Sequence, residues 1–183
     1  MKNNPGMAHF ETKSDSEISF WLDSYDDLFS DFDPRSYAIR GISDDFLTEA
    51  RKAIRDKEAE KIKVHFLIPI LKRHRSDDTI IKKRLYNHFK KHHHLLLQEH
   101  QKIRKRGMIL TLAGTLLMVS AGFVAAYENG NTFLRVLLVL IEPGGWFLTW
   151  SGLDTLVFPH EAKTEELNFY RKMAKSDISF NCY

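Results

Sequence analysis

The feature that most constrains the fold is a stretch of twenty-one residues, 107–127, that contains no charged side chain. As an α-helix this stretch is about 32 Å long, close to the roughly 30 Å hydrocarbon thickness of a bilayer. A turn-forming sequence, Glu-Asn-Gly-Asn, follows at 128–131, and a second apolar stretch occupies residues 132–158. We therefore predict a hairpin of two transmembrane helices over residues 107–158.

Charge is distributed very unevenly around this hairpin. Residues 61–106 contain fourteen Lys and Arg against three acids, a local excess of 14 − 3 = +11, whereas residues 14–33 contain seven acids and no Lys or Arg. Basic residues also follow the second apolar stretch, and the connecting turn has none. The positive-inside rule then predicts a multi-pass protein of the inner (cytoplasmic) membrane with both termini in the cytoplasm.

These composition changes divide the chain into four segments. They are an acidic-aromatic N-terminal arm (1–40), a basic cytoplasmic domain (41–106), the transmembrane hairpin (107–158) and a cytoplasmic C-terminal segment (159–183). In the arm, large apolar residues recur with helical spacing over residues 20–32, opposite an acidic face. We expect a short helix there, which either packs on the cytoplasmic domain or docks on the basic stretch as a gate or partner site.

The cytoplasmic domain has both helical and strand signals. Ser43, followed by two aspartates, predicts a helix that extends to about residue 57. Residues 62–68 alternate apolar and polar, which predicts a half-buried strand. A short amphipathic helix over 165–174 and a final strand over 177–180, paired with the 62–68 strand, complete the expected elements. The fold class is thus an α+β membrane protein whose small cytoplasmic domain has a short two-stranded sheet.

A long helix is expected to join the cytoplasmic domain to the first span. Ser76-Asp77-Asp78 is an N-cap signal, and no helix breaker follows before Gly107. An unbroken helix of roughly fifty residues would be about 75 Å long. Because so small a domain cannot cover its apolar side, we expect a homo-oligomer.

Glu142 is the residue most suggestive of chemistry. It lies about ten residues into the second span, where an ionised carboxylate costs several kcal/mol unless it is paired or hydrated. Arg135 is two helical turns earlier on the same face, and Asp154 lies at the inner boundary. Glu142 could make a structural polar contact beside a kink at 143–145, or form a ring around an oligomer axis that binds or gates cations.

The sequence around Glu142 resembles a known family. The segment reads Glu142-Pro143-Gly144-Gly145-Trp146-Phe147-Leu148-Thr149-Trp150. It is similar to the pore hairpin of the mitochondrial calcium uniporter family, which has Glu-Pro and then an aromatic-Phe-aliphatic-Thr-aromatic run. The resemblance implies a pore position for Glu142, with Trp146 and Thr149 in the matching run. The family has an Asp three residues before the Glu, where this chain has Val139, so calcium selectivity is not implied.

Histidines and basic residues gather before the first span. His88 and His92 are one helical turn apart, a spacing that can place two imidazoles on one metal ion, although only Glu99 is available as a further ligand. A solvated basic face is the simpler interpretation, and it would attract anionic lipid headgroups. The expected headgroup-binding residues are Lys90, Lys91, Lys102, Arg104, Lys105 and Arg106. Nucleic acid is disfavoured as a partner because few aromatic residues are interleaved for base stacking.

No arrangement of a nucleophile, a phosphate-binding loop or a cofactor motif is present in the sequence. We therefore expect a protein that is not an enzyme and has no cofactor. The favoured hypothesis is an oligomeric pore for ion transport, or a membrane-perturbing assembly, controlled by its cytoplasmic domain. The alternative is a membrane-tethered interaction or regulatory module in which the hairpin is only an anchor.

Overall fold

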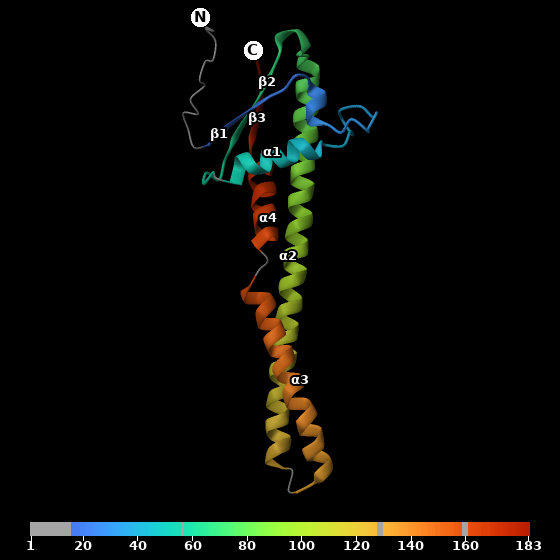
Figure 1. Cartoon of the computed structure of the whole chain (residues 1–183), viewed down its shortest axis with the longest axis vertical. Helices are drawn as coiled ribbons and strands as arrows, with labels where there is room; N and C mark the ends of the chain where they lie inside the picture. The colour runs from blue at the N-terminus through green and yellow to red at the C-terminus, as the bar shows by residue number, and fades with distance from the viewer. Residues whose placement is uncertain (1–15, 56, 128–129, 159–160) are drawn as a thin grey trace, which may run out of the picture. The chain divides into compact units, whose positions relative to one another are not determined.

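The computed structural model describes residues 16–55, 57–127, 130–158 and 161–183. The elements along the chain are β1 (Glu17–Trp21), the 3-10 turn η1 (Tyr25–Leu28), α1 (Asp44–Arg55), β2 (Lys63–Ile68), the 3-10 turn η2 (Ile70–Lys72), α2 (Arg75–Ala126), α3 (Thr132–Val157), α4 (Glu161–Ala174) and β3 (Asp177–Cys182) (Figure 1). They form two compact units. The sheet unit comprises Met1–His93 and Glu165–Tyr183, and the helix-pair unit comprises His94–Thr164.

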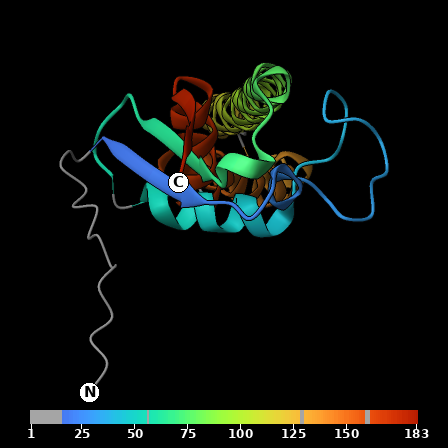
Figure 2. The ribbon, with the colours of Figure 1, turned by 90° about the horizontal axis from the view of Figure 1, so that it is seen from above.

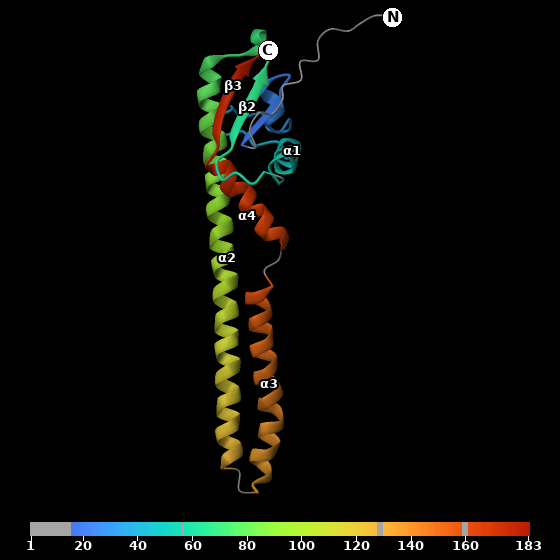
Figure 3. The same ribbon diagram turned by 90° about the vertical axis from the view of Figure 1, so that its left-hand side faces the viewer.

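The sheet unit is built on three parallel strands in the order β1-β2-β3, and Figure 3 shows β2 and β3 side by side. Apolar residues of the three strands fall in register on one face. Phe20 is opposite Phe66, and Phe66 is opposite Phe180. The Phe46 ring of α1 packs 5.7 Å from the rings of both Phe20 and Phe66, so α1 covers this face (Figure 2).

The opposite face of the sheet is mostly polar, with Trp21 and Leu67 as apolar members at one end. Lys63 Nζ donates to Glu17 Oε1 across β1 and β2 at 3.2 Å, and His65 Nδ1 lies 2.6 Å from Ser179 Oγ across β2 and β3. Parallel sheets are usually covered on both faces. In the described part of this chain the polar side chains instead form cross-strand pairs on a partly exposed face.

Two sequence predictions are wrong here. Residues 20–32 do not form a helix, because 17–21 are a strand and only Tyr25–Leu28 make a 3-10 turn. The sheet has three strands instead of two. The apolar residues with helical spacing are indeed buried, as Tyr25, Leu28 and Phe29 show. A single 3-10 turn capped by Ser24 is enough to bury them, so no longer helix is needed.

Three other elements are confirmed. Helix α1 starts directly after Ser43, whose carbonyl accepts from Leu47 N at 3.0 Å. The predicted strand is β2, in which Val64, Phe66 and Ile68 have no exposed surface. The final strand is β3, which pairs with β2 in parallel.

A buried polar cluster joins η1 to the start of α2. The Tyr25 hydroxyl donates to Asp78 Oδ1, and Arg73 donates to Asp78 Oδ2 from Nε at 3.0 Å and from Nη2 at 2.8 Å. Burial, together with the hydrogen bond to Asp78, raises the pKa of Tyr25 above its ordinary value. The Asp78 carboxylate, which the sequence suggested as part of a cap, therefore stabilises a tertiary contact.

Helix α2 is a single element of 52 residues, which confirms the prediction of an unbroken helix. At 1.5 Å per residue it is about 78 Å long. Its first turns bury Ile81, Leu85 and Phe89 within the sheet unit. The Phe89 ring contacts Phe169 and Tyr170 of α4 at 6.0 and 6.1 Å between centroids, which confirms that the predicted 165–174 helix is amphipathic and packed.

Candidate functional site

Among the described residues two helices, α2 and α3, are long and apolar enough to cross a membrane, and the apolar part of α2 and all of α3 belong to the helix-pair unit. They run side by side in both Figure 1 and Figure 3. Only 11% of the most apolar window of α2 and 17% of that of α3 are buried. The core helix of a soluble protein would be mostly buried, so these helices are not covered in that way by the rest of the described chain.

Glycines bring the backbones of α2 and α3 into contact. A Cβ atom on Gly114 would lie 2.7 Å from the carbonyl oxygen of Gly145, and one on Gly152 would lie 2.7 Å from the carbonyl oxygen of Gly107. Neither position can accept a larger side chain without separating the helices. Close backbone approach at small residues is the usual way in which apolar helices associate without a hydrophobic driving force.

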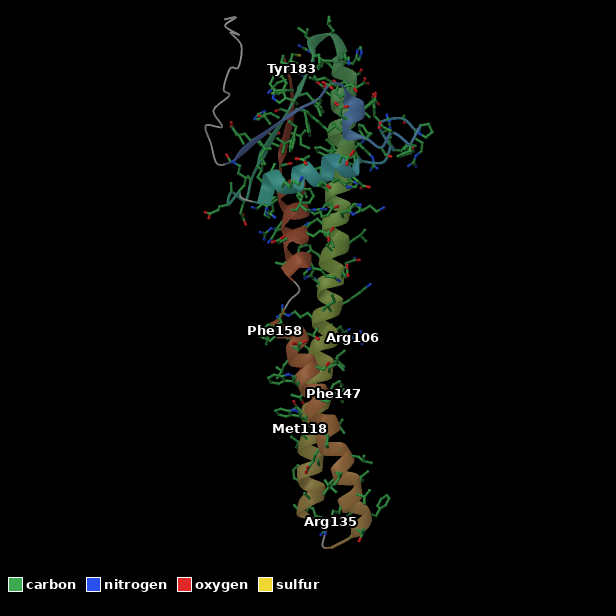
Figure 4. The ribbon with its side chains drawn as sticks, in the orientation of Figure 1. Arg106, Met118, Arg135, Phe147, Phe158 and Tyr183 are labelled. Atoms are coloured by element: carbon green, nitrogen blue, oxygen red, sulfur yellow. The ribbon has the colours of Figure 1, made fainter. Side chains whose placement is uncertain are left out.

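Glu142 lies outside this helix–helix contact. Its side chain is exposed on α3, and among the described residues it has no hydrogen-bond or ion-pair partner. Arg135 is also exposed and lies seven residues earlier, nearly two turns, so the two residues share one side of α3. Figure 4 labels Arg135 at the end of α3 that adjoins the turn.

The exposed side of α3 continues from Glu142 into aromatic residues. The rings of Trp146 and Trp150 are stacked at 6.0 Å between centroids, and both are more than half exposed. We call the exposed residues Arg135, Glu142, Trp146 and Trp150 the α3 stripe. It is an apolar surface with two charged positions, and the α2 backbone does not cover it.

Thr149 and Asp154 lie elsewhere. Thr149 is half-buried against α2, and its hydroxyl donates to the carbonyl of Gly145 at 2.9 Å. Asp154 is exposed near the end of α3. Pro143 lies inside α3, which continues through it from Thr132 to Val157 although proline has no N–H to donate. The five residues predicted from sequence are therefore divided between the α3 stripe, the helix–helix contact and the end of the helix.

His88 and His92 form a ring pair in the sheet unit. Their centroids are 4.3 Å apart, and His92 stacks on Tyr170 at 5.2 Å. Nε2 of His88 is buried and has no hydrogen-bond partner among the described residues. Burial lowers the pKa of His88 to about 4, and it lowers the pKa of His92 as well.

The His88–His92 pair has no third ligand at hand. No group of three or more His, Cys, Asp or Glu that could hold a metal ion occurs in the described part of the chain. Glu99, the one candidate third ligand in the sequence, instead pairs with Lys163 at 2.6 Å. The arrangement is that of two neutral imidazoles packed against a tyrosine.

The six basic residues predicted to bind headgroups all have exposed side chains on α2. One of them, Arg104, also lines a cavity of about 650 Å³ within the helix-pair unit, together with His100, Asp154 and Lys163. The sequence analysis missed this cavity. Its signal was the position of Lys163, a cation shortly after the end of the second apolar stretch.

Comparison of the chain with family models, curated proteins and solved structures finds no match. The resemblance of residues 142–150 to the uniporter pore hairpin therefore stays a prediction.

Proposed function

We propose that this chain is a two-pass membrane protein whose copies associate through the α3 stripe into a pore or membrane-perturbing assembly. The spans are the apolar part of α2 and all of α3, both termini are cytoplasmic, and the sheet unit controls the assembly. The observation that carries the proposal is the exposed Glu142 carboxylate, which has no partner among the described residues of its own chain.

Membrane embedding is supported by the low burial of both apolar helices. Large apolar side chains that are more than half exposed lie along both helices: Leu112, Leu116, Phe123, Phe133, Val136, Leu140, Phe147. A soluble monomer rarely exposes a contiguous apolar surface of this extent. In a bilayer the same side chains would contact acyl chains, which are as apolar as they are.

Self-association is supported by the energetics of Glu142. Near the middle of a span a lone carboxylate costs about 3 kcal/mol or more if it faces lipid. Protein contacts from a second copy, or water held between copies, would remove most of this cost. A ring of such carboxylates is a common device for cation binding in channels.

The resemblance to the uniporter family leads to a narrower proposal. With Glu142 present and Val139 where the family has an acid, the assembly would have a single carboxylate ring. Such a ring would favour cations over anions without selecting calcium.

The test is ion flux through the purified full-length chain reconstituted in liposomes. We expect Glu142→Gln to reduce cation flux strongly, because the charge that attracts cations is removed while the side-chain shape is kept. Glu49→Gln, at an exposed surface ion pair with Lys52, is the matched control and should leave flux unchanged. Equal flux from all three proteins would contradict the pore proposal, as would a strictly monomeric mass in mild detergent.

The tether alternative is favoured by a different observation. The sheet unit has its own core, and the contact between α2 and α3 is made at glycines and threonines and not at Glu142. Replacing residues 107–158 with an unrelated two-helix anchor distinguishes the two functions. Retained cellular function would support the tether, and loss of function with a correctly inserted anchor would support the pore.

A further inference from the structure

The cavity in the helix-pair unit has two chemically different halves. Arg104, His100, Lys163 and Asp154 supply charged or polar groups, and Met108 and Leu156 are among its apolar lining residues. Its volume of about 650 Å³ lies in the range of cavities that bind small organic molecules. All of these residues belong to the same compact unit.

The polar half is suited to an anion. The Arg104 guanidinium has no ion-pair partner among the described residues and can present two parallel N–H groups to a phosphate. The Lys163 ammonium pairs with Glu99 at 2.6 Å, so it shares its charge. Arg104 and Lys163 against Asp154 give 2 − 1 = +1 in the cavity wall, and three more cations follow or flank Arg104 on α2: Lys102, Lys105, Arg106.

Met108, in the apolar part of the lining, follows Arg104 by about one helical turn. The two residues are four positions apart, about 6 Å along the axis, and Gly107 opens the uncharged stretch. Apolar side chains also line the cavity before Arg104, at Leu97 and Ile103, so its cations have apolar neighbours on both sides that acyl chains can contact. A free phosphate ion would fill only the polar half.

We propose that this cavity binds one anionic phospholipid per chain, with its phosphate on Arg104 and Lys163 and the first acyl carbons on Met108 and Leu156. The Asp154 carboxylate beside the cations favours a headgroup that has a hydroxyl donor as well as its phosphate. This proposal rests on the membrane embedding proposed above, and it assigns to one cavity the lipid contact that the sequence suggested for a whole basic face.

The test counts lipids on the full-length protein by native mass spectrometry, after reconstitution in a mixture of phosphatidylglycerol and phosphatidylcholine. We expect one phosphatidylglycerol to remain on each wild-type chain in preference to phosphatidylcholine. In the double variant Arg104→Gln/Lys163→Gln, the affinity for phosphatidylglycerol should fall about tenfold. Removing two unpaired cations would lower it roughly 30-fold, but Lys163 already shares its charge with Glu99, so the expected loss is smaller. The matched control is Lys102→Gln/Lys105→Gln, which removes the same charge from α2 outside the cavity.

Two further measurements distinguish binding of a lipid from binding of a simple anion. Met108→Trp should displace the lipid by filling the apolar half without a change of charge, and millimolar inorganic phosphate should not displace it. Equal loss of lipid in the cavity and control variants would overturn the proposal, because the contact would then be a diffuse basic surface. Displacement by phosphate, or no effect of Met108→Trp, would also overturn it.

Alkaline carbonate extraction separates this inference from the proposed function. A protein released by carbonate would overturn both. A protein that stays in the membrane but has equal lipid affinity in all variants would overturn the cavity proposal alone.

Discussion

His88 should make the sheet unit unstable in acid. Its pKa in the folded protein is lowered from 6.5 to about 4, first by burial and then by His92. The unfolded chain therefore binds more protons than the folded chain between these two values, so stability is full above pH 6.5 and is lost as the pH falls toward 4. For a fully desolvated ring the loss at pH 5 is about 2 kcal/mol, and partial exposure of the ring reduces this to about 1 kcal/mol.

The groups that face the pair come from three helices. On α2 they are Arg84 and Lys91, which oppose a further positive charge. On α4 they are Tyr170 and Glu166, of which Glu166 favours protonation of His92. Arg51 of α1 acts on Tyr170: burial raises the pKa of Tyr170, and the positive charge of Arg51 lowers it in part. Burial and the cations outweigh the single acid, Glu166, so the pKa values of His88 and His92 are both lowered.

The assay is hydrogen exchange of the β2 amides in the full-length protein in mild detergent, from pH 7.5 to pH 5, corrected for the intrinsic rate. His88→Leu should remove the loss of about 1 kcal/mol over this range, because leucine fills the site and has no proton to bind. His94→Gln changes an exposed histidine on the same helix. In this variant the protection of the β2 amides should depend on pH as it does in the wild type. If the protection of the β2 amides in His88→Leu depends on pH as it does in the wild type, the reasoning is refuted, since every other titrating group is still present in that variant.

Three more perturbations test the packing. Gly114→Ala should lower the thermal midpoint in detergent, through overpacking of about 1–3 kcal/mol against α3, whereas Gly122→Ala should not, because nothing lies within 4 Å of a Cβ there. Phe66→Ala removes the centre of the sheet core and should cost about 3–5 kcal/mol, measured as lost protection of the β2 amides. Asp78→Asn leaves Arg73 without its counter-charge and should cost about 2 kcal/mol in urea unfolding, with Tyr25→Phe having a smaller effect.

Elements with a strong local signal were predictable from the sequence. Helix α1 has a cap and a regular apolar stripe, β2 alternates polar and apolar residues from Lys63 to Phe66, and α2 contains no proline between residues 75 and 126. Each of these signals acts within a few residues, so tertiary packing had little to override.

Strand β1 was missed although the chain contains a signal for it. Residues 17–20 read Glu-Ile-Ser-Phe and residues 177–180 read Asp-Ile-Ser-Phe, so the two edge strands have nearly the same sequence. Both pair with β2 in the same register, with isoleucine opposite Val64 and phenylalanine opposite Phe66. The helical spacing that starts at Phe20 overlapped this strand and concealed it.

The residues of the candidate site could be predicted from the sequence, but their arrangement in space could not. Sequence alone places Glu142, Thr149 and Asp154 along one helix, but it does not tell which of them faces α2. That depends on the glycine contacts at Gly114 and Gly152, which fix the rotation of one helix against the other. The cavity at Arg104 was equally hidden, because it is lined by residues about fifty positions apart in the sequence.

The parallel pairing of β2 and β3 joins two strands that are far apart in the sequence. Parallel neighbours need a crossover connection, and here residues 69–176 form it, including all of α3. During synthesis the third strand therefore emerges after the residues of the helix pair, and until then the β3 edge of β2 has no partner. If the helix pair enters a membrane during synthesis, the chain has an unpaired, apolar strand edge during that step. Such edges are sites of aggregation. The topology thus delays completion of the sheet until the residues of the helix pair have been synthesised, whichever function the hairpin serves.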